Sequence, residues 1–197
     1  KSGKINNAAN ITTKAVYPAA LLTDADCGFA YAAIDQAIEQ GITAAHTYGI
    51  AAMAIGNSHH CGSLSIHVEK IAKAGLIGFM VTNAPSAIAP WGGTKPLFGT
   101  NPIAFAVPRQ RQNPLVIDMS LSVVARGKIM HAAKTGQPIP EGWALDLDGN
   151  ATTNPQDALK GTMVPVGGPK GTALALMVEI QIGERRVGKE CRSRWSP

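Results

Sequence analysis

Three histidines and a cysteine lie within one short stretch, "GNSHHCGSLSIH", from Gly56 to His67. Side chains of these types can ligate a metal ion or transfer a proton, so this stretch is the first candidate for chemistry. The zinc-binding spacings C-x₂-C and H-E-x-x-H do not occur in it, and adjacent side chains such as His60 and Cys61 rarely converge on one ion. We therefore expect no metal site, and we expect the protein to carry no stoichiometric zinc.

Two roles are open for His60. A histidine between a strand and a helix, beside small residues, is well placed to face a cleft and to exchange a proton with a carbinol or an imine. In the alternative, the ring caps the helix or makes a local hydrogen bond. The residues alone do not choose between these roles. The other histidines at positions 46, 67 and 131 fall on predicted helices, where we expect surface or packing positions.

Two short segments could bind an anion. "CGSLS" (61–65) opens a predicted helix with small residues, and "GGPKG" (167–171) does the same and adds the charge of Lys170. Backbone N–H groups at such helix starts can hold phosphate. Neither segment is a Walker A loop or a G-x-G-x-x-G fingerprint. Asp118 ends the predicted strand "PLVID", where a carboxylate faces a ligand or caps the following turn.

Strand and helix patterns alternate around these residues, which indicates an α/β fold with a mixed sheet. We find no internal repeat and no clean linker, and residues 1–23 are expected to be irregular and extended. Predicted strands cover residues 50–56, 76–83, 103–108 and 114–120, and predicted helices cover 27–49, 63–75, 122–136 and 167–180.

Composition sets further bounds. The chain has 197 residues, of which 45% are hydrophobic, enough for one sizeable core. No apolar run reaches the roughly 18 residues of a membrane span, and no signal peptide is visible. Three cysteines are too few and too scattered for a disulfide framework, so we expect a cytoplasmic protein.

The net charge of +5 does not indicate nucleic-acid binding. Residues 184–197, "ERRVGKECRSRWSP", hold five Lys or Arg and two Glu, so the rest of the chain carries only +2. This tail follows an apolar helical run, has no amphipathic period, and resembles a translated sequencing adapter. We expect it to be non-native, with a genuine basic tail as the alternative, and we expect its deletion not to lower the stability of the chain.

Several specific strings occur together in one order: "NSHHCG", "GTNP", "VIDMS", "PEGWALDLDG" and "GGPKG". Together they resemble the type-2 malate/L-lactate dehydrogenase family, over residues from about 24 to 179. The resemblance implies a non-Rossmann fold that binds a nicotinamide dinucleotide, NAD(P)H, in a single catalytic and cofactor-binding region over residues 1–183. It also implies a small-molecule substrate and a homodimer, with neither nucleic acid nor membrane as a partner.

The family's functional positions map onto this sequence through those strings. His60 matches the proton acceptor of the ureidoglycolate dehydrogenase branch, and Thr100 matches a substrate contact. The implied cofactor contacts are Cys61, Gly62, Ser63, Leu64 and Ser65, then Asp118, Met119 and Ser120, and finally Lys170 and Gly171.

Within the family, "SHHCG" and "DMSLS" most resemble the branch that reduces cyclic imino acids, Δ1-piperideine-2-carboxylate and Δ1-pyrroline-2-carboxylate. Malate, lactate, sulfolactate and diketogulonate enzymes stay open. The family's early Ser-His segment and its C-terminal portion are not found here, so we expect a fold truncated at both ends and inactive alone. The alternative is a non-catalytic protein that binds a nucleotide.

Overall fold

The computed structural model describes residues 5–183, which form two compact units. The first unit comprises residues 5–80 and 104–118, and the second comprises residues 81–103 and 119–183. Each unit is described by itself below. The sequence predicted a single catalytic region over 1–183, and that stays a prediction. The expected non-native tail, 184–197, lies outside the described residues.

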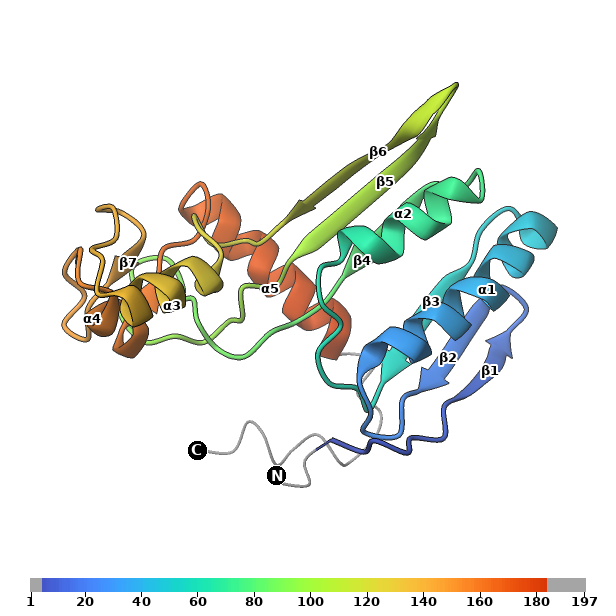
Figure 1. The fold of residues 1–197 in the computed structure, drawn as a ribbon, viewed down its shortest axis with the longest axis horizontal. Coiled ribbons are helices and arrows are strands. Elements are labelled where there is room, and N and C mark those ends of the chain that lie inside the picture. Colours follow the sequence, from blue (N-terminus) through green and yellow to red (C-terminus); the bar gives the residue numbers. More distant parts are fainter. Residues whose placement is uncertain (1–4, 184–197) are drawn as a thin grey trace. The chain divides into compact units, whose positions relative to one another are not determined.

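The first unit contains a three-stranded mixed sheet (Figure 1). β1 (Thr12–Tyr17) pairs antiparallel with β2 (Ala20–Asp24), and β2 pairs parallel with β3 (Ala52–Gly56). This confirms the predicted α/β class with a mixed sheet. The expectation of irregular structure up to residue 23 was wrong. Most side chains of β1 are exposed, so this edge strand lacks the apolar alternation by which strands are recognised.

Helix α1 (Ala30–Tyr48) packs against β2 and β3. It ends as predicted at Gly49, whose φ of 81° is the left-handed conformation that glycine adopts most easily. Gly41 lies so close to Met53 of β3 that a Cβ there would overlap the thioether. The helix therefore approaches the sheet closely, as its alanine-rich sequence allows.

Helix α2 (Ser65–Lys73) packs on a second sheet, of order β4-β5-β6. The strands are β4 (Gly78–Val81), β5 (Ile103–Arg109) and β6 (Gln112–Met119), close to the predicted positions. Leu64 and Val68 of the helical segment are buried with Ala104 and Ala106 of β5. From the sequence, Ser63 or Ser65 is expected to cap the start of α2. This expectation is wrong, because the N-cap residue is Leu64 and no side chain of the cap bonds to the helix.

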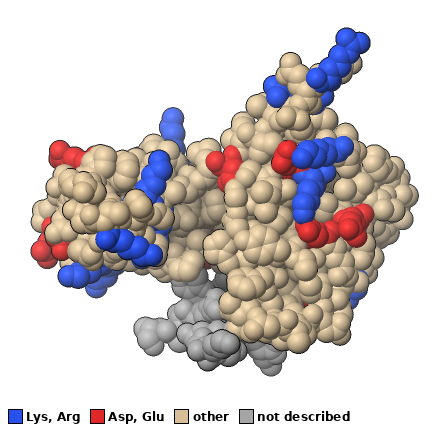
Figure 2. Space-filling view, in the orientation of Figure 1, with Lys and Arg blue, Asp and Glu red and all other residues tan. Residues whose placement is uncertain are grey.

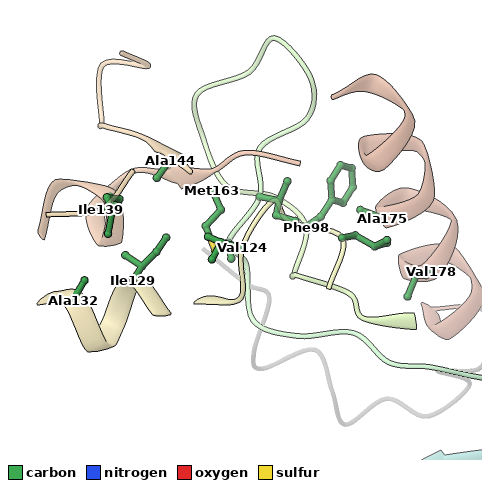
Figure 3. Packing of buried hydrophobic residues seen from close by; sticks show 13 residues of the cluster. Phe98, Val124, Ile129, Ala132, Ile139, Ala144, Met163, Ala175 and Val178 are labelled. Carbon is green, nitrogen blue, oxygen red and sulfur yellow. The ribbon is translucent and has the colours of Figure 1, made fainter. Parts of the chain in front are cut away.

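The second unit has one apolar cluster, part of which Figure 3 shows. Ile129 from α3 (Arg126–Thr135) and Val178 from α5 (Pro169–Gly183) both belong to it. Three further elements were not predicted because each has at most six residues, too few to show a period. They are β7 (Ala144–Leu145), α4 (Pro155–Lys160) and β8 (Thr162–Met163).

Charged side chains are scattered over the described surface. On the face in Figure 2, some basic and acidic groups lie side by side and others are isolated, and basic groups project from the tip of the β5–β6 hairpin. Arg109 and Arg111 are exposed at this tip. None of the helices in residues 5–183 combines the length and the apolar character needed to cross a membrane.

Candidate active site

The loop from β3 to α2 holds His60 at its centre. The loop is tied to the start of α1 by two backbone bonds: the N–H of His59 donates to the Gly28 carbonyl (2.9 Å) and the N–H of Ala30 donates to the His60 carbonyl (3.3 Å). The side chain of His60 is exposed. The backbone of the loop is therefore fixed while the imidazole stays accessible.

The imidazole of His60 makes a local hydrogen bond. The N–H of Gly62 donates to Nδ1 at 2.6 Å. An atom that accepts a hydrogen bond must keep its lone pair, so in the neutral ring the hydrogen is on Nε2. In this conformation His60 presents a donor to its surroundings, and proton uptake at Nδ1 requires this bond to break. The local bond is one of the two roles left open by the sequence.

Asp118, at the end of β6, lies at the N-terminus of α2. Its Oδ2 accepts from the Ser63 hydroxyl and from the backbone N–H of Ser65, both at 2.8 Å. The hydroxyls of Ser63 and Ser65 also hydrogen-bond to each other. A carboxylate here satisfies a free N–H of the helix and interacts favourably with the helix dipole. Two segments 53 residues apart in sequence are joined in this way.

This arrangement changes the interpretation of "CGSLS" as a phosphate site. The N–H of Ser65 already donates to a carboxylate, and a phosphate beside Asp118 would meet a like charge. An exposed carboxylate accepts hydrogen bonds, so it suits a ligand hydroxyl or amide N–H. The site around Asp118 therefore fits a sugar hydroxyl or a carboxamide better than a phosphate.

Cys61, which follows His60 in this loop, has a half-buried side chain. Burial raises the pKa of the Cys61 thiol above its ordinary value; a backbone hydrogen bond opposes the rise, and the negative charge of Asp118 adds to it. The side chain packs beside both apolar clusters of the first unit. A protonated, half-buried thiol is a poor nucleophile, so Cys61 contributes packing rather than covalent chemistry.

In the second unit, Thr100 lies between two residues, Gly99 and Asn101, that fix the irregular segment before β5. A Cβ on Gly99 would overlap the backbone of Ala84, so only glycine fits there. Asn101 is fully buried; its side chain accepts from the N–H of Ala84 and donates to the Ala175 carbonyl and to the Glu179 carboxylate. The sequence predicted a site role for Thr100 but none for Asn101, although the specific string "GTNP" contains both residues.

The remaining predicted site residues of this unit lie in two places. Met119 and Ser120 follow Asp118 directly, with Met119 exposed and Ser120 half-buried. Lys170 is exposed in the first turn of α5. Gly171 is buried, and a Cβ there would overlap the backbone of Val166. The start of α5 thus places a lysine beside the backbone N–H groups of a helix N-terminus, an arrangement that suits phosphate.

Metal ligation has no geometric support in the part of the chain that is described: residues 5–183 contain no group of three or more His, Cys, Asp or Glu side chains arranged to hold an ion. The three cysteine and histidine side chains at positions 59–61 therefore form no such group. The expectation that the protein carries no zinc stays a prediction, to be checked by elemental analysis.

Comparison with known proteins identifies the family. A family model described as malate/L-lactate dehydrogenase matches residues 1–183. The chain belongs to this family. The resemblance drawn from "GTNP" and "PEGWALDLDG" is confirmed. The family match ends at residue 183, and the interpretation of the following residues as non-native stays a prediction.

Several relatives of the malate/L-lactate dehydrogenase family resemble this chain over most of its length. A "(2R)-3-sulfolactate dehydrogenase (NADP(+))" from Chromohalobacter salexigens is 52% identical over 91% of this chain and 54% of that protein. A "Delta(1)-pyrroline-2-carboxylate/Delta(1)-piperideine-2-carboxylate reductase" from Pseudomonas putida is 43% identical over 91% of this chain and 53% of that protein. The chain thus spans about half the length of these relatives.

Solved structures agree with this assignment. The crystal structure of delta1-piperideine-2-carboxylate reductase from Pseudomonas syringae pvar. tomato superposes with a TM-score of 0.88 at 38% identity, covering 92% of this chain and 55% of that one. A sulfolactate dehydrogenase from Methanocaldococcus jannaschii gives a TM-score of 0.80 at 37% identity, covering 91% and 52%. The fold described above is therefore the fold of this family.

Proposed function

We propose that this chain is part of an NAD(P)H-dependent oxidoreductase. It transfers a hydride to or from C2 of a small 2-oxo or 2-hydroxy acid, or of a cyclic 2-imino acid. The observation that carries the proposal is the 52% identity to an NADP-dependent dehydrogenase across 180 residues, a range that includes the His60 loop and Asp118. The proposal extends to a homodimer in the cytoplasm, supported by the sparse cysteines and by the family resemblance.

The residues present fit such a cofactor in two different ways. In the first unit, the exposed carboxylate of Asp118 suits a hydroxyl or carboxamide group. In the second unit, Lys170 and the start of α5 suit a phosphate, and Gly171 leaves no Cβ beside the backbone. When bound, the nicotinamide would supply the hydride; this chain's residues would bind and orient it.

His60 then contributes a hydrogen bond rather than a proton. The N–H of Gly62 holds its Nδ1, so Nε2–H points away as a donor suited to a carboxylate or carboxamide oxygen. We therefore expect His60→Gln to weaken cofactor or substrate binding and to leave most of kcat at saturation. A loss of about 10²-fold or more in kcat, with unchanged cofactor affinity, would instead assign proton transfer to His60.

The substrate is tested in a chimera, because the chain covers only half of its relatives. Residues 1–183 replace the matching segment of the Chromohalobacter salexigens enzyme, and the panel contains sulfolactate, malate, lactate and the two cyclic imino acids, each with NADPH and NADH. The higher identity to the sulfolactate enzyme supports turnover of sulfolactate with NADP⁺, and the imino acids are the second candidates.

Direct binding of NADPH and NADH to the 197-residue chain completes the test. Binding of either cofactor together with an active chimera supports the proposed oxidoreductase. Binding together with a folded but inactive chimera supports a non-catalytic protein that binds a nucleotide. A folded chain that binds neither cofactor, together with an inactive chimera, would refute both functions.

A further inference from the structure

One buried imidazole is not explained by the site described so far. His67, in the first turn of α2, is only 1% exposed. Its Nε2 lies 2.8 Å from the carbonyl oxygen of Cys61. A carbonyl oxygen can only accept, so Nε2 carries the hydrogen and donates it. The other ring nitrogen, Nδ1, is also buried and has no hydrogen-bond partner among the described residues.

A histidine that only filled space here would be unfavourable. Leaving a buried polar atom without a partner costs about 1–3 kcal/mol, a cost that an apolar side chain of similar size avoids. The one hydrogen bond of the ring fixes the carbonyl of Cys61, which immediately follows His60. The imidazole therefore acts on the loop in which the candidate site residues lie.

Tyr31 of α1 contacts the same loop. Its ring centroid lies 6.1 Å from that of His67. Its side chain packs against the α-carbon of Gly62, so that a Cβ there would lie only 2.5 Å from the hydroxyl. Gly62 also has a φ of 73°, which a residue with a Cβ rarely adopts. The peptide around Cys61 and Gly62 is thus held by His67 and by Tyr31.

Fixing this peptide places the groups of the candidate site. The N–H of Gly62 donates to His60, and the next residue, Ser63, donates to Asp118. Rotation of the peptide between Cys61 and Gly62 would turn that N–H away from the imidazole of His60. A donor on the Cys61 carbonyl opposes such a rotation, because the carbonyl and the N–H belong to the same planar group.

We propose that His67 is a positioning residue of the cofactor site: by donating to the Cys61 carbonyl it holds the Gly62 N–H against His60 and Ser63 beside Asp118. His67 itself makes no contact with cofactor or substrate. The proposal rests on the function proposed above, and its test therefore includes one measurement that needs no cofactor.

The test compares two substitutions in the 197-residue chain. His67→Gln keeps an N–H donor, whereas His67→Leu keeps the bulk and removes the donor. His46→Leu is the matched control, because His46 is an exposed histidine of the same unit. We expect NADPH affinity to fall about tenfold in His67→Leu, the equivalent of one hydrogen bond of 1.4 kcal/mol, and to stay within about threefold of wild type in the other two variants.

Hydrogen exchange of the Gly62 and Ser65 amides, which donate to His60 and to Asp118, is the measurement without cofactor. We expect these amides to exchange faster than in wild type in His67→Leu and at about the wild-type rate in His67→Gln. We expect the urea midpoint of unfolding to be similar in the two variants. Equal exchange and equal affinity in the Leu and Gln variants would overturn the proposal. The proposal would also be overturned if protection from exchange fell along the whole of α2 in both variants, in proportion to their loss of global stability.

The two failures are distinguishable. If wild type binds neither NADPH nor NADH, amide exchange alone decides the role of His67, and the proposed function fails when the chimera is inactive as well. If wild type binds cofactor and the Leu variant binds equally well with an unchanged loop, only the positioning role fails. A Leu variant that does not fold is replaced by His67→Phe, judged by the same exchange pattern against His67→Gln.

Discussion

Asn101 is the residue whose loss we expect to matter most for the second unit. It is fully buried and joins three segments through the N–H of Ala84, the carbonyl of Ala175 and the carboxylate of Glu179, at 3.3, 3.0 and 2.9 Å. Its φ of 35° lies in the left-handed region, which asparagine tolerates better than alanine. Asn101→Ala therefore removes three hydrogen bonds and adds backbone strain.

The expected magnitude follows from these contacts. A neutral hydrogen bond contributes about 1 kcal/mol and one to a charged group about 1.5–3 kcal/mol, while a Cβ in the left-handed region costs about 1 kcal/mol more than asparagine does. The long bond to Ala84 counts least. We expect Asn101→Ala to lower the free energy of unfolding by about 4 kcal/mol. Asn101→Gly, which relieves the strain, should cost about 1 kcal/mol less.

The assay is urea unfolding followed by tryptophan fluorescence. Trp91 and Trp143 both lie in the second unit, and Trp143 packs against its core, so the signal reports on this unit once Trp195 is replaced by Phe. Gln137→Ala, an exposed amide of the same unit, is the control and should change stability by less than about 0.5 kcal/mol. A loss below about 1 kcal/mol in Asn101→Ala would refute the reasoning.

Three further predictions follow from the candidate site and its surroundings. Because burial raises the pKa of Cys61, iodoacetamide should modify it more slowly at neutral pH than exposed Cys27, as measured by peptide mass spectrometry; equal rates would contradict the raised pKa. Hydrogen bonds from the backbone N–H groups of Asn150 and Asp148 lower the pKa of Asp146. The ionised Asp146 therefore stabilises the fold at any pH above the ordinary pKa of aspartate, and this contribution is lost as the pH falls through the lowered pKa. Asp146→Ala should therefore lower the free energy of unfolding at pH 7 and lower it less at pH 3, as measured by urea unfolding. An equal loss at the two pH values would contradict the lowered pKa of Asp146. Elemental analysis should find no stoichiometric zinc, and one zinc per chain that is lost in a Cys61 variant would overturn our interpretation of the histidine-rich loop.

The local elements with a long pattern could be predicted from the sequence. The alanine-rich face of α1 and its terminal Gly49 specify a helix and its end because both signals lie within neighbouring residues. The same holds for β3 and for α5, which begins within "GGPKG". The family, too, could be recognised, because strings such as "GTNP" are specific without any knowledge of three-dimensional contacts.

The short and the non-local features could not be predicted. The edge strand β1 has little apolar alternation and forms through pairing with β2. The serine expected to cap α2 instead donates to Asp118, a residue 55 positions away, because a carboxylate of β6 reaches the helix start. No pattern among neighbouring residues of the sequence predicts this contact between β6 and the start of α2.

The candidate site shows the same division. The sequence by itself determined which side chains are available around His60, and it left open whether the ring transfers a proton or makes a local bond. The tertiary structure decided that Nδ1 accepts from Gly62, that a carboxylate rather than a phosphate satisfies the start of α2, and that His67 and Asn101 are buried polar anchors. Hydrogen-bond partners depend on distance in space, and only the packed chain sets that distance.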